Sequence, residues 1–281
     1  MATGDAPAVK LCFDLSKPDA FDVARRAFLI RLRAEPSWHW LGLSNPEPEF
    51  RPHVDFVSSY DRGEGFKRIL LDVYWALIAE GVIAPGSAGR WGEVYEFHLT
   101  EYGRRLLAEP DYQPHDPAEY LRQLGASIPS TDATVLAYLQ ESLHCYARGL
   151  MVASAMMLGI AAERVFLLIC DSLLGALKDS AEQAAFQKIL DRNAMKPKLD
   201  WVSDKLREVQ SPKRPADLPE DVDIKIPGIF NLIRCQRNDV GHPRPAPPTV
   251  TRDDAYGYLR IFPSYYATAE KVREFLEKNK V

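Results

Sequence analysis

The sequence lacks the short motifs that mark several common enzyme classes. It contains no G-x-x-x-x-G-K, no G-x-S-x-G and no H-E-x-x-H, which removes phosphate-loop hydrolases, esterases with a nucleophile elbow and zinc proteases. Its cysteines are few and scattered, at Cys12, Cys145, Cys170 and Cys235, without a C-x-x-C pair or a histidine at ligand spacing. This distribution argues against a zinc site and for reduced thiols in the cytosol. We therefore expect no metal, no cofactor and a cytoplasmic location.

The sequence also lacks an excess of basic charge. The formal net charge is -4, so any contact with nucleic acid must use a local patch. Residues Met1–Val9 lack the basic-then-apolar order of a signal peptide. The most apolar run, Gly149–Cys170, is interrupted by Glu163 and Arg164, a charged pair that is costly in lipid. We interpret that run as a buried helix and expect no membrane partner.

What is present is ordinary for a soluble globular chain of 281 residues, with 46% hydrophobic and 26% charged residues. Such a length favours one large domain or two modest ones. We divide the sequence into an N-terminal domain at 1–110, a linker at 111–129, rich in Pro and Asp, and a C-terminal domain at 130–281. A short helix around Tyr120 and Leu121 is expected inside the linker.

The N-terminal domain alternates helical and extended patterns. A strand or arm is expected at Val9–Leu15, a helix at Ala20–Leu32, and loop with short elements over Glu35–Val54. Apolar residues recur at three- and four-residue spacing in Phe66–Gly81, which predicts a helix. A short strand within Glu80–Gly86, a loop, an alternating strand at Val94–Leu99 and a helix capped by Thr100 follow.

This order of elements, with "E-G-V-I" at the end of the helix and "L-T-E-Y-G-R-R-L-L" after the second strand, resembles the second half of a winged helix-turn-helix domain. The resemblance covers about forty residues and implies a recognition helix within Phe66–Ala79 and a β-wing near Gly86–Glu93. Lys67 and Arg68 are then candidate nucleic-acid contacts at the start of the helix. The remaining residues are poorly suited to DNA, because sequence readers usually bring Arg, Asn or Gln to base edges. The alternative is a winged helix used for packing or protein contact.

The C-terminal domain is predicted to be a run of helices, so the fold class is mainly α. Ser130-Thr131-Asp132 is expected to cap the first helix. The later helices are predicted at Leu150–Leu177, Ala181–Leu190, Leu199–Val209, Ile224–Asp239 and Asp253–Lys278.

One stretch of this domain, Arg234–Pro243, carries a candidate site. Pro243 disfavours helical geometry at His242, and Gly241 is expected to close the helix in the left-handed conformation. His242 then lies just past the helix, about 7–8 Å along the axis from Arg237. Both side chains can reach one small anion such as phosphate. An R-x4-H pair is weak evidence by itself, and the alternative is a structural arginine followed by a helix stop.

The same motif, R-N-x3-H, follows two helices with the sequences "YLQESLHCYARGL" and "AMMLGIAAE". Together these features resemble the HEPN superfamily of higher-eukaryote and prokaryote nucleotide-binding domains, over about Ser130–Lys278. The resemblance implies an up-and-down helical bundle that commonly forms homodimers. Many members are metal-independent ribonucleases of toxin–antitoxin, abortive-infection or antiviral systems, and others are binding or docking modules.

Carried over to this chain, the resemblance assigns catalytic roles to three residues. Arg237 would hold the scissile phosphate, His242 would transfer protons, and Asn238 would orient the phosphate or its partner. RNA would be cleaved to a 2′,3′-cyclic phosphate and a 5′-hydroxyl. Arg234 and Arg244 would extend the basic patch.

Glu163 is the fourth candidate, since a buried carboxylate needs a partner. Arg237 is one possibility, and the alternatives are an exposed edge with Arg164 or a pair with Arg148. A competing hypothesis for the whole protein is a non-enzymatic regulator that binds DNA, a nucleotide or a protein such as an antitoxin. A pure interaction scaffold is the third.

Overall fold

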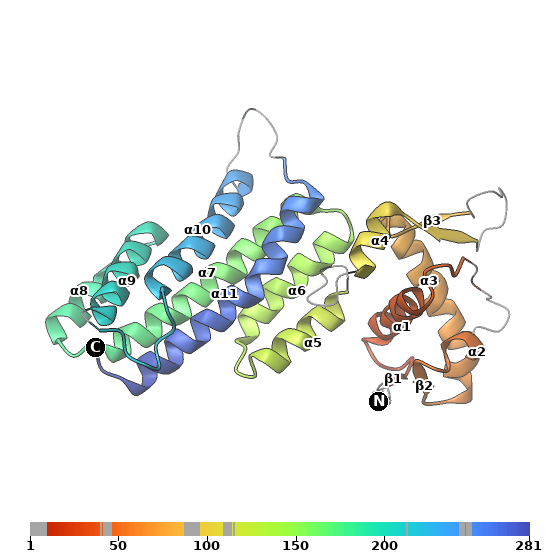
Figure 1. The fold of residues 1–281 in the computed structure, drawn as a ribbon, viewed down its shortest axis with the longest axis horizontal. Helices are drawn as coiled ribbons and strands as arrows, with labels where there is room; N and C mark the ends of the chain where they lie inside the picture. The colour runs from red at the N-terminus through yellow and green to blue at the C-terminus, as the bar shows by residue number, and fades with distance from the viewer. Residues whose placement is uncertain are drawn as a thin grey trace, which may run out of the picture. The chain divides into compact units, whose positions relative to one another are not determined.

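The computed structural model describes residues 10–39, 41, 47–86, 96–108, 114, 116–211, 213–241, 245 and 249–281. It confirms that the chain is mainly helical. The chain divides into two compact units, Met1–Arg122 with Ala147–Gly149, and Gln123–Tyr146 with Leu150–Val281. Figure 1 traces the elements of both units.

The first unit is built on two helices, α1 (Ala20–Ala34) and α3 (Phe66–Ala79), which pack against each other. Strand β1 (Leu11–Phe13) pairs in parallel with β2 (Val54–Phe56). The short elements α2 (Glu47–Phe50) and η1 (Asp61–Gly65) flank β2. Aromatic side chains fill the core where these elements meet, because large rings bury much apolar area. They are Phe13, Phe28, Trp38, Phe50, Phe66, Tyr74 and Phe97.

The predicted order helix, strand, strand, helix is confirmed after α3. Strands β3 (Ile83–Pro85) and β4 (Phe97–Leu99) are antiparallel, and α4 (Glu101–Ala108) follows. Thr100 is the predicted N-cap, since its Oγ1 accepts a hydrogen bond from the Gly103 amide at 2.9 Å and donates to the Gly81 carbonyl at 2.6 Å. Gly81 has a φ of +73°, which favours glycine at this turn. Most of the predicted wing, Gly86–Glu93, lies outside the described residues.

Helix α5 (Pro117–Ser127) occupies much of the predicted linker. It is longer than the short helix that the sequence predicted around Tyr120 and Leu121. Asp116 begins it by accepting a hydrogen bond from the Glu119 amide at 3.2 Å. The division between the two units crosses α5, after Arg122.

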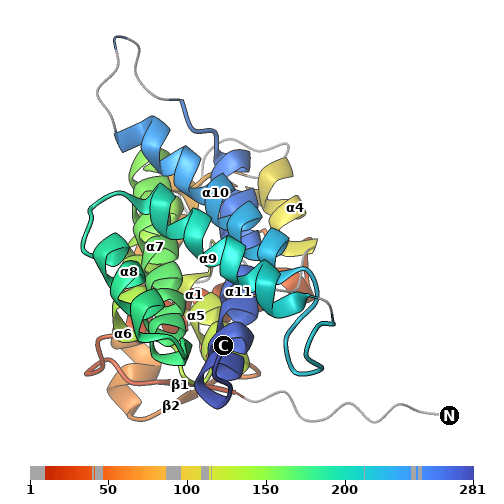
Figure 2. The same cartoon turned by 90° about the vertical axis from the view of Figure 1, so that its left-hand side faces the viewer.

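The second unit is a helical bundle of α6 (Ala133–Ala147), α7 (Met151–Ala176), α8 (Ser180–Leu190), α9 (Met195–Gln210), α10 (Val222–Gly241) and α11 (Arg252–Lys278). Figures 1 and 2 show α7, α10 and α11 side by side, and these helices pack against one another. Asp132 caps α6 by accepting from the Thr134 and Val135 amides. Thr251 and Asp254 cap each other at the start of α11.

Helix α7 is the core helix of this bundle. Its length and apolar composition would suffice to cross a membrane, yet 56% of its most apolar window is buried inside the protein. The core helix of a soluble protein has these properties. Its buried side chains include Leu158, Val165, Phe166, Ile169 and Leu173.

Candidate functional site

The candidate site lies where α7 and α10 approach closely. A Cβ atom at Gly159 would stand 2.4 Å from the Arg237 Cβ and 2.5 Å from its Cγ. A Cβ atom at Gly241 would stand 2.8 Å from the Met156 Cε. The two helices run antiparallel here, since Met156 meets Gly241 and the later Gly159 meets the earlier Arg237. Glycine at 159 therefore gives the stem of Arg237 a place against the backbone of α7.

Glu163 lies four residues after Gly159, on the same face of α7. Arg237 Nη2 donates a hydrogen bond to Glu163 Oε2 at 3.1 Å, and Nη1 donates to Asn238 Oδ1 at 2.9 Å. The Arg237 side chain is 31% exposed and that of Glu163 is 14% exposed. The structure thus brings together three of the four residues that the sequence assigned to catalysis. The guanidinium is fixed on two sides and still reaches solvent.

The alternative partner proposed for Glu163 on its own helix is engaged elsewhere. Arg164 forms an ion pair with Asp132, with 2.9 Å between Nη2 and Oδ2. This interaction lowers the pKa of Asp132 through a hydrogen bond from the guanidinium. Glu163 and Arg164 consequently point to different neighbours, although they are adjacent in the sequence.

Burial raises the pKa of Glu163, while the positive charges of Arg237, Arg234 and Lys198 act in the opposite direction. Arg234 lies one turn before Arg237 on α10. Its Nη2 donates to the neutral Asn231 Oδ1 at 3.3 Å, and its buried Nε has no hydrogen-bond partner among the described residues. The Nε of Arg237 is also buried and has no partner in the part of the chain that the structure describes. The site therefore holds more positive than negative charge.

Lys198 was not predicted as part of this site. It lies on α9, which packs against both α7 and α10, and only 7% of its surface is exposed. The sequence carries a signal that would have revealed it. Lys198 precedes Val202 by four residues and Leu206 by eight, so it shares the apolar face of an amphipathic helix.

The predicted geometry of Gly241 is wrong. Among described glycines, positive φ angles occur at Gly81, Gly86 and Gly149; Gly241 is instead the last residue of α10, in helical conformation. The physical reason for a glycine there is the close contact with Met156 rather than a left-handed turn.

The remaining predicted residues are placed as follows. His242 and Arg244 lie outside the described residues. Lys67 and Arg68 belong to α3 in the first unit, where Lys67 Nζ lies 3.6 Å from Glu64 Oε1 and Arg68 is exposed. Their role as nucleic-acid contacts stays a prediction.

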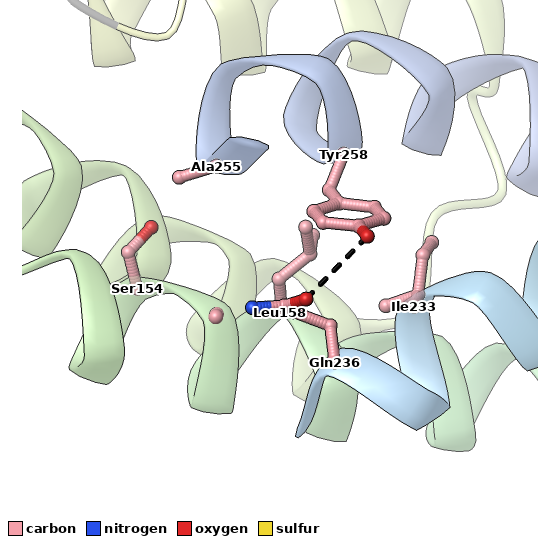
Figure 3. A pocket seen from close by; sticks show the side chains of 7 residues that line it. Ser154, Leu158, Ile233, Gln236, Ala255 and Tyr258 are labelled. Carbon is pink, nitrogen blue, oxygen red and sulfur yellow. Dashed lines mark hydrogen bonds between the residues drawn. The ribbon is translucent and has the colours of Figure 1, made fainter. Parts of the chain in front are cut away.

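A shallow, mostly apolar crevice lies beside the motif, between α7, α10 and α11. It is lined by Ser154, Ala155, Leu158, Ile233, Gln236, Ala255 and Tyr258. Figure 3 shows the hydroxyl of Tyr258 turned toward Gln236, to whose Oε1 it donates at 3.4 Å. Gln236 thus ties α10 to α11, while the next residue, Arg237, ties α10 to α7. The two contacts fix the rotation of α10 within the bundle.

Within the part of the chain that the structure describes, no group of three or more His, Cys, Asp or Glu side chains is arranged to hold a metal ion. Arginine, asparagine and glutamate are the chemical groups that the site offers. Comparison of the chain with protein-family models, with curated proteins and with solved structures found no match.

Proposed function

We propose that the protein is a metal-independent endoribonuclease of HEPN type, with its active site around Arg237. The observation that carries the proposal is the joining of Glu163, Arg237 and Asn238 at one partly exposed point between α7 and α10. A planar guanidinium matches the oxygens of a phosphate. Its stem is held by Gly159, which suits a group that must meet a transition state in a fixed orientation.

In the proposed reaction the 2′-hydroxyl of RNA loses its proton to a base and its oxygen attacks the adjacent phosphorus. The bond from phosphorus to the 5′-oxygen breaks, and that oxygen takes up a proton. The products are a 2′,3′-cyclic phosphate and a 5′-hydroxyl. Arg237 stabilises the charge that develops on the phosphate oxygens, and His242 transfers protons. Glu163 and Asn238 hold the guanidinium of Arg237 in place.

The scattered cysteines favour a cytoplasmic location, and the HEPN resemblance implies a homodimer whose two motifs face one cleft. A prokaryotic defence or toxin role, with an antitoxin as partner, follows from the same resemblance. Arg234 and Arg244 would supply further phosphate contacts in each copy.

The test uses the purified full-length chain and a mixture of RNAs, with a chelator present throughout. Wild type should cut RNA and leave 2′,3′-cyclic phosphate ends. Arg237→Ala should lower the rate about 10²–10³-fold, by analogy with the loss of one transition-state donor. His242→Ala should lower it about 10²–10⁴-fold, as expected for a general acid or base.

The matched control is Arg207→Ala, because Arg207 is 65% exposed on α9 and pairs with Asp204. It should cut RNA at the wild-type rate. Wild-type protein that leaves RNA intact beside an active reference nuclease would refute the proposal. Undiminished cleavage by the double variant Arg237→Ala, His242→Ala would refute it equally.

A second function is favoured by the surface of the first unit. Trp75, on the helix α3 that would be the recognition helix, is 49% exposed, and Tyr60 is 60% exposed. Exposed aromatic residues are typical of protein contacts rather than of base readers. A non-enzymatic regulator would use this surface for a protein partner or DNA. Salt-sensitive binding of random DNA without RNA cleavage would favour it.

A further inference from the structure

Lys198 is a largely covered lysine of α9, and the acid of this site on which its charge acts is Glu163. Within the described ranges its amine has no hydrogen bond and no ion pair, although 93% of the residue's surface is covered, the complement of its 7% exposure. Another lysine of the same helix, Lys205, is similarly covered but is bonded to Glu182 at 2.9 Å and lies 3.3 Å from Glu208. Isolated buried charge is costly and is normally paired. Lys198 is therefore unusual within its own helix.

The charges around Lys198 do not balance. Glu163 is the acid that senses Lys198, Arg234 and Arg237 together, and its hydrogen bond goes to Arg237. Among the described residues, the hydrogen-bond partner found for Arg234 is the neutral Asn231. Lys198 on α9 and Arg234 on α10 thus keep their positive charges, while the charge of Arg237 is neutralised by Glu163. A site of this composition attracts an anion.

We propose that Lys198 and Arg234 form a binding subsite for a phosphate group next to the Arg237–Glu163 pair, with Lys198 as its most buried contact. Arg234 and Arg237 lie three residues apart on one face of α10, a rise of about 4.5 Å. This spacing gives each arginine its own phosphate. The inference rests on the proposed function in one respect: the phosphate is taken to belong to the same RNA strand that Arg237 holds.

Stability and binding are expected to move in opposite directions when Lys198 is changed. Lys198→Met keeps much of the aliphatic stem and removes the unpaired charge, so it should raise the melting temperature by about 2–4 °C. Lys205→Met removes a paired charge from the same helix and should lower it by a similar amount. If Lys198 had a structural role, both Lys198→Met and Lys205→Met would lower the melting temperature.

Inorganic phosphate is the first probe, because it tests the subsite without any cleavage. Added phosphate should raise the melting temperature of wild type, since a ligand that binds only the folded state stabilises it. The response should be retained by Lys198→Arg and Lys205→Met and lost by Lys198→Met. A decrease in the melting temperature of Lys198→Met, or an unchanged phosphate response, overturns the proposal.

A fluorescent 2′-O-methyl RNA is the second probe, because it lacks the attacking hydroxyl and cannot be cut. Lys198→Met should weaken its binding about tenfold, the loss of one hydrogen bond to a charged group. The slope of log affinity against log salt should become shallower by about 0.7, the value for one phosphate of a single strand. Lys196→Met, which changes a 75%-exposed lysine two residues away, should leave both quantities unchanged.

The two probes together show whether the bound phosphate belongs to RNA, and they test the subsite separately from the proposed nuclease activity. A phosphate response without an effect of Lys198→Met on RNA affinity would overturn the assignment to RNA and indicate a small phosphorylated ligand. RNA binding that depends on Lys198 in a protein that cuts nothing would sustain the subsite and refute the nuclease.

Discussion

Replacing Gly159 by alanine tests whether the close approach of α7 and α10 holds the site together. The added Cβ would stand 2.4 Å from the Arg237 Cβ. That distance is far inside van der Waals contact, and the atom it meets is attached directly to the backbone of α10. The two helices must move apart, and we expect this movement to weaken the 3.1 Å hydrogen bond between Arg237 and Glu163.

The magnitude follows from two opposing effects. Alanine in a helix interior is favoured over glycine by about 0.5–1 kcal/mol. Overpacking of a buried contact costs about 1–3 kcal/mol. We expect Gly159→Ala to lower the free energy of unfolding by about 1–2 kcal/mol and the rate of RNA cleavage with it.

A matched substitution isolates the contact. Gly257 lies inside α11, is exposed, and a Cβ there would meet nothing within 4 Å. Gly257→Ala should therefore show only the helix preference and stabilise the protein by about 0.5–1 kcal/mol. Urea unfolding and RNA cleavage of the two variants, measured side by side, give the comparison. Equal stability of the two variants, or full activity of Gly159→Ala, would refute the reasoning.

Three further predictions concern charges in both units. Glu80→Gln should lower the free energy of unfolding in urea by about 3–5 kcal/mol, because Glu80, 6% exposed, forms a bidentate pair with Arg25, 3% exposed. Glu101→Gln is the control, since Glu101 pairs with Arg104 on the surface, and it should change the free energy of unfolding by less than about 1 kcal/mol. Burial raises the pKa of Asp116 to about 6 from 3.8, so the folded state binds this proton more tightly than the unfolded state does. The free energy of unfolding of wild type should therefore rise by about 1–3 kcal/mol, relative to that of Asp116→Asn, as pH falls from 7 to 4. Urea unfolding of both proteins between pH 7 and pH 4 that finds a constant difference in stability would contradict this prediction. Arg237→Gln should raise the pKa of Glu163 further, since the largest opposing charge is removed, and a carbon-13 NMR titration of Glu163 that shows a lower value would be contrary evidence.

The helices were predictable where one face of a segment is apolar. Ala20–Leu32 and Leu150–Leu177 correspond closely to α1 and α7, and Thr100 acts as a cap, because these features depend on residues a few positions apart. The parallel pairing of β1 with β2 joins Leu11 to Val54. A contact across more than forty residues leaves no local period, so no pattern in the sequence indicates this pairing.

The site was predictable in its members and not in its geometry. A glutamate inside an apolar helix needs a partner, and Arg237 is one of the partners that the sequence predicts. The role of Gly159 was not foreseeable, because a helical glycine reveals a close approach only when the facing residue is known. The spacing of Lys198 from Val202 and Leu206 indicates that it lies on the apolar face of α9, but a lysine at the edge of such a face usually reaches solvent. Its low exposure of 7% depends on the packing of α9 against α7 and α10.

The close packing of the Arg237 stem against Gly159 affects the affinity for a ligand as well as the position of the guanidinium. A free arginine side chain loses about 2 kcal/mol of rotamer entropy when it is immobilised. Here the stem is confined by α7 and the guanidinium by Glu163 and Asn238, so that loss is incurred when the chain folds. A ligand that reaches this arginine finds it already ordered, and more of the contact energy remains for binding.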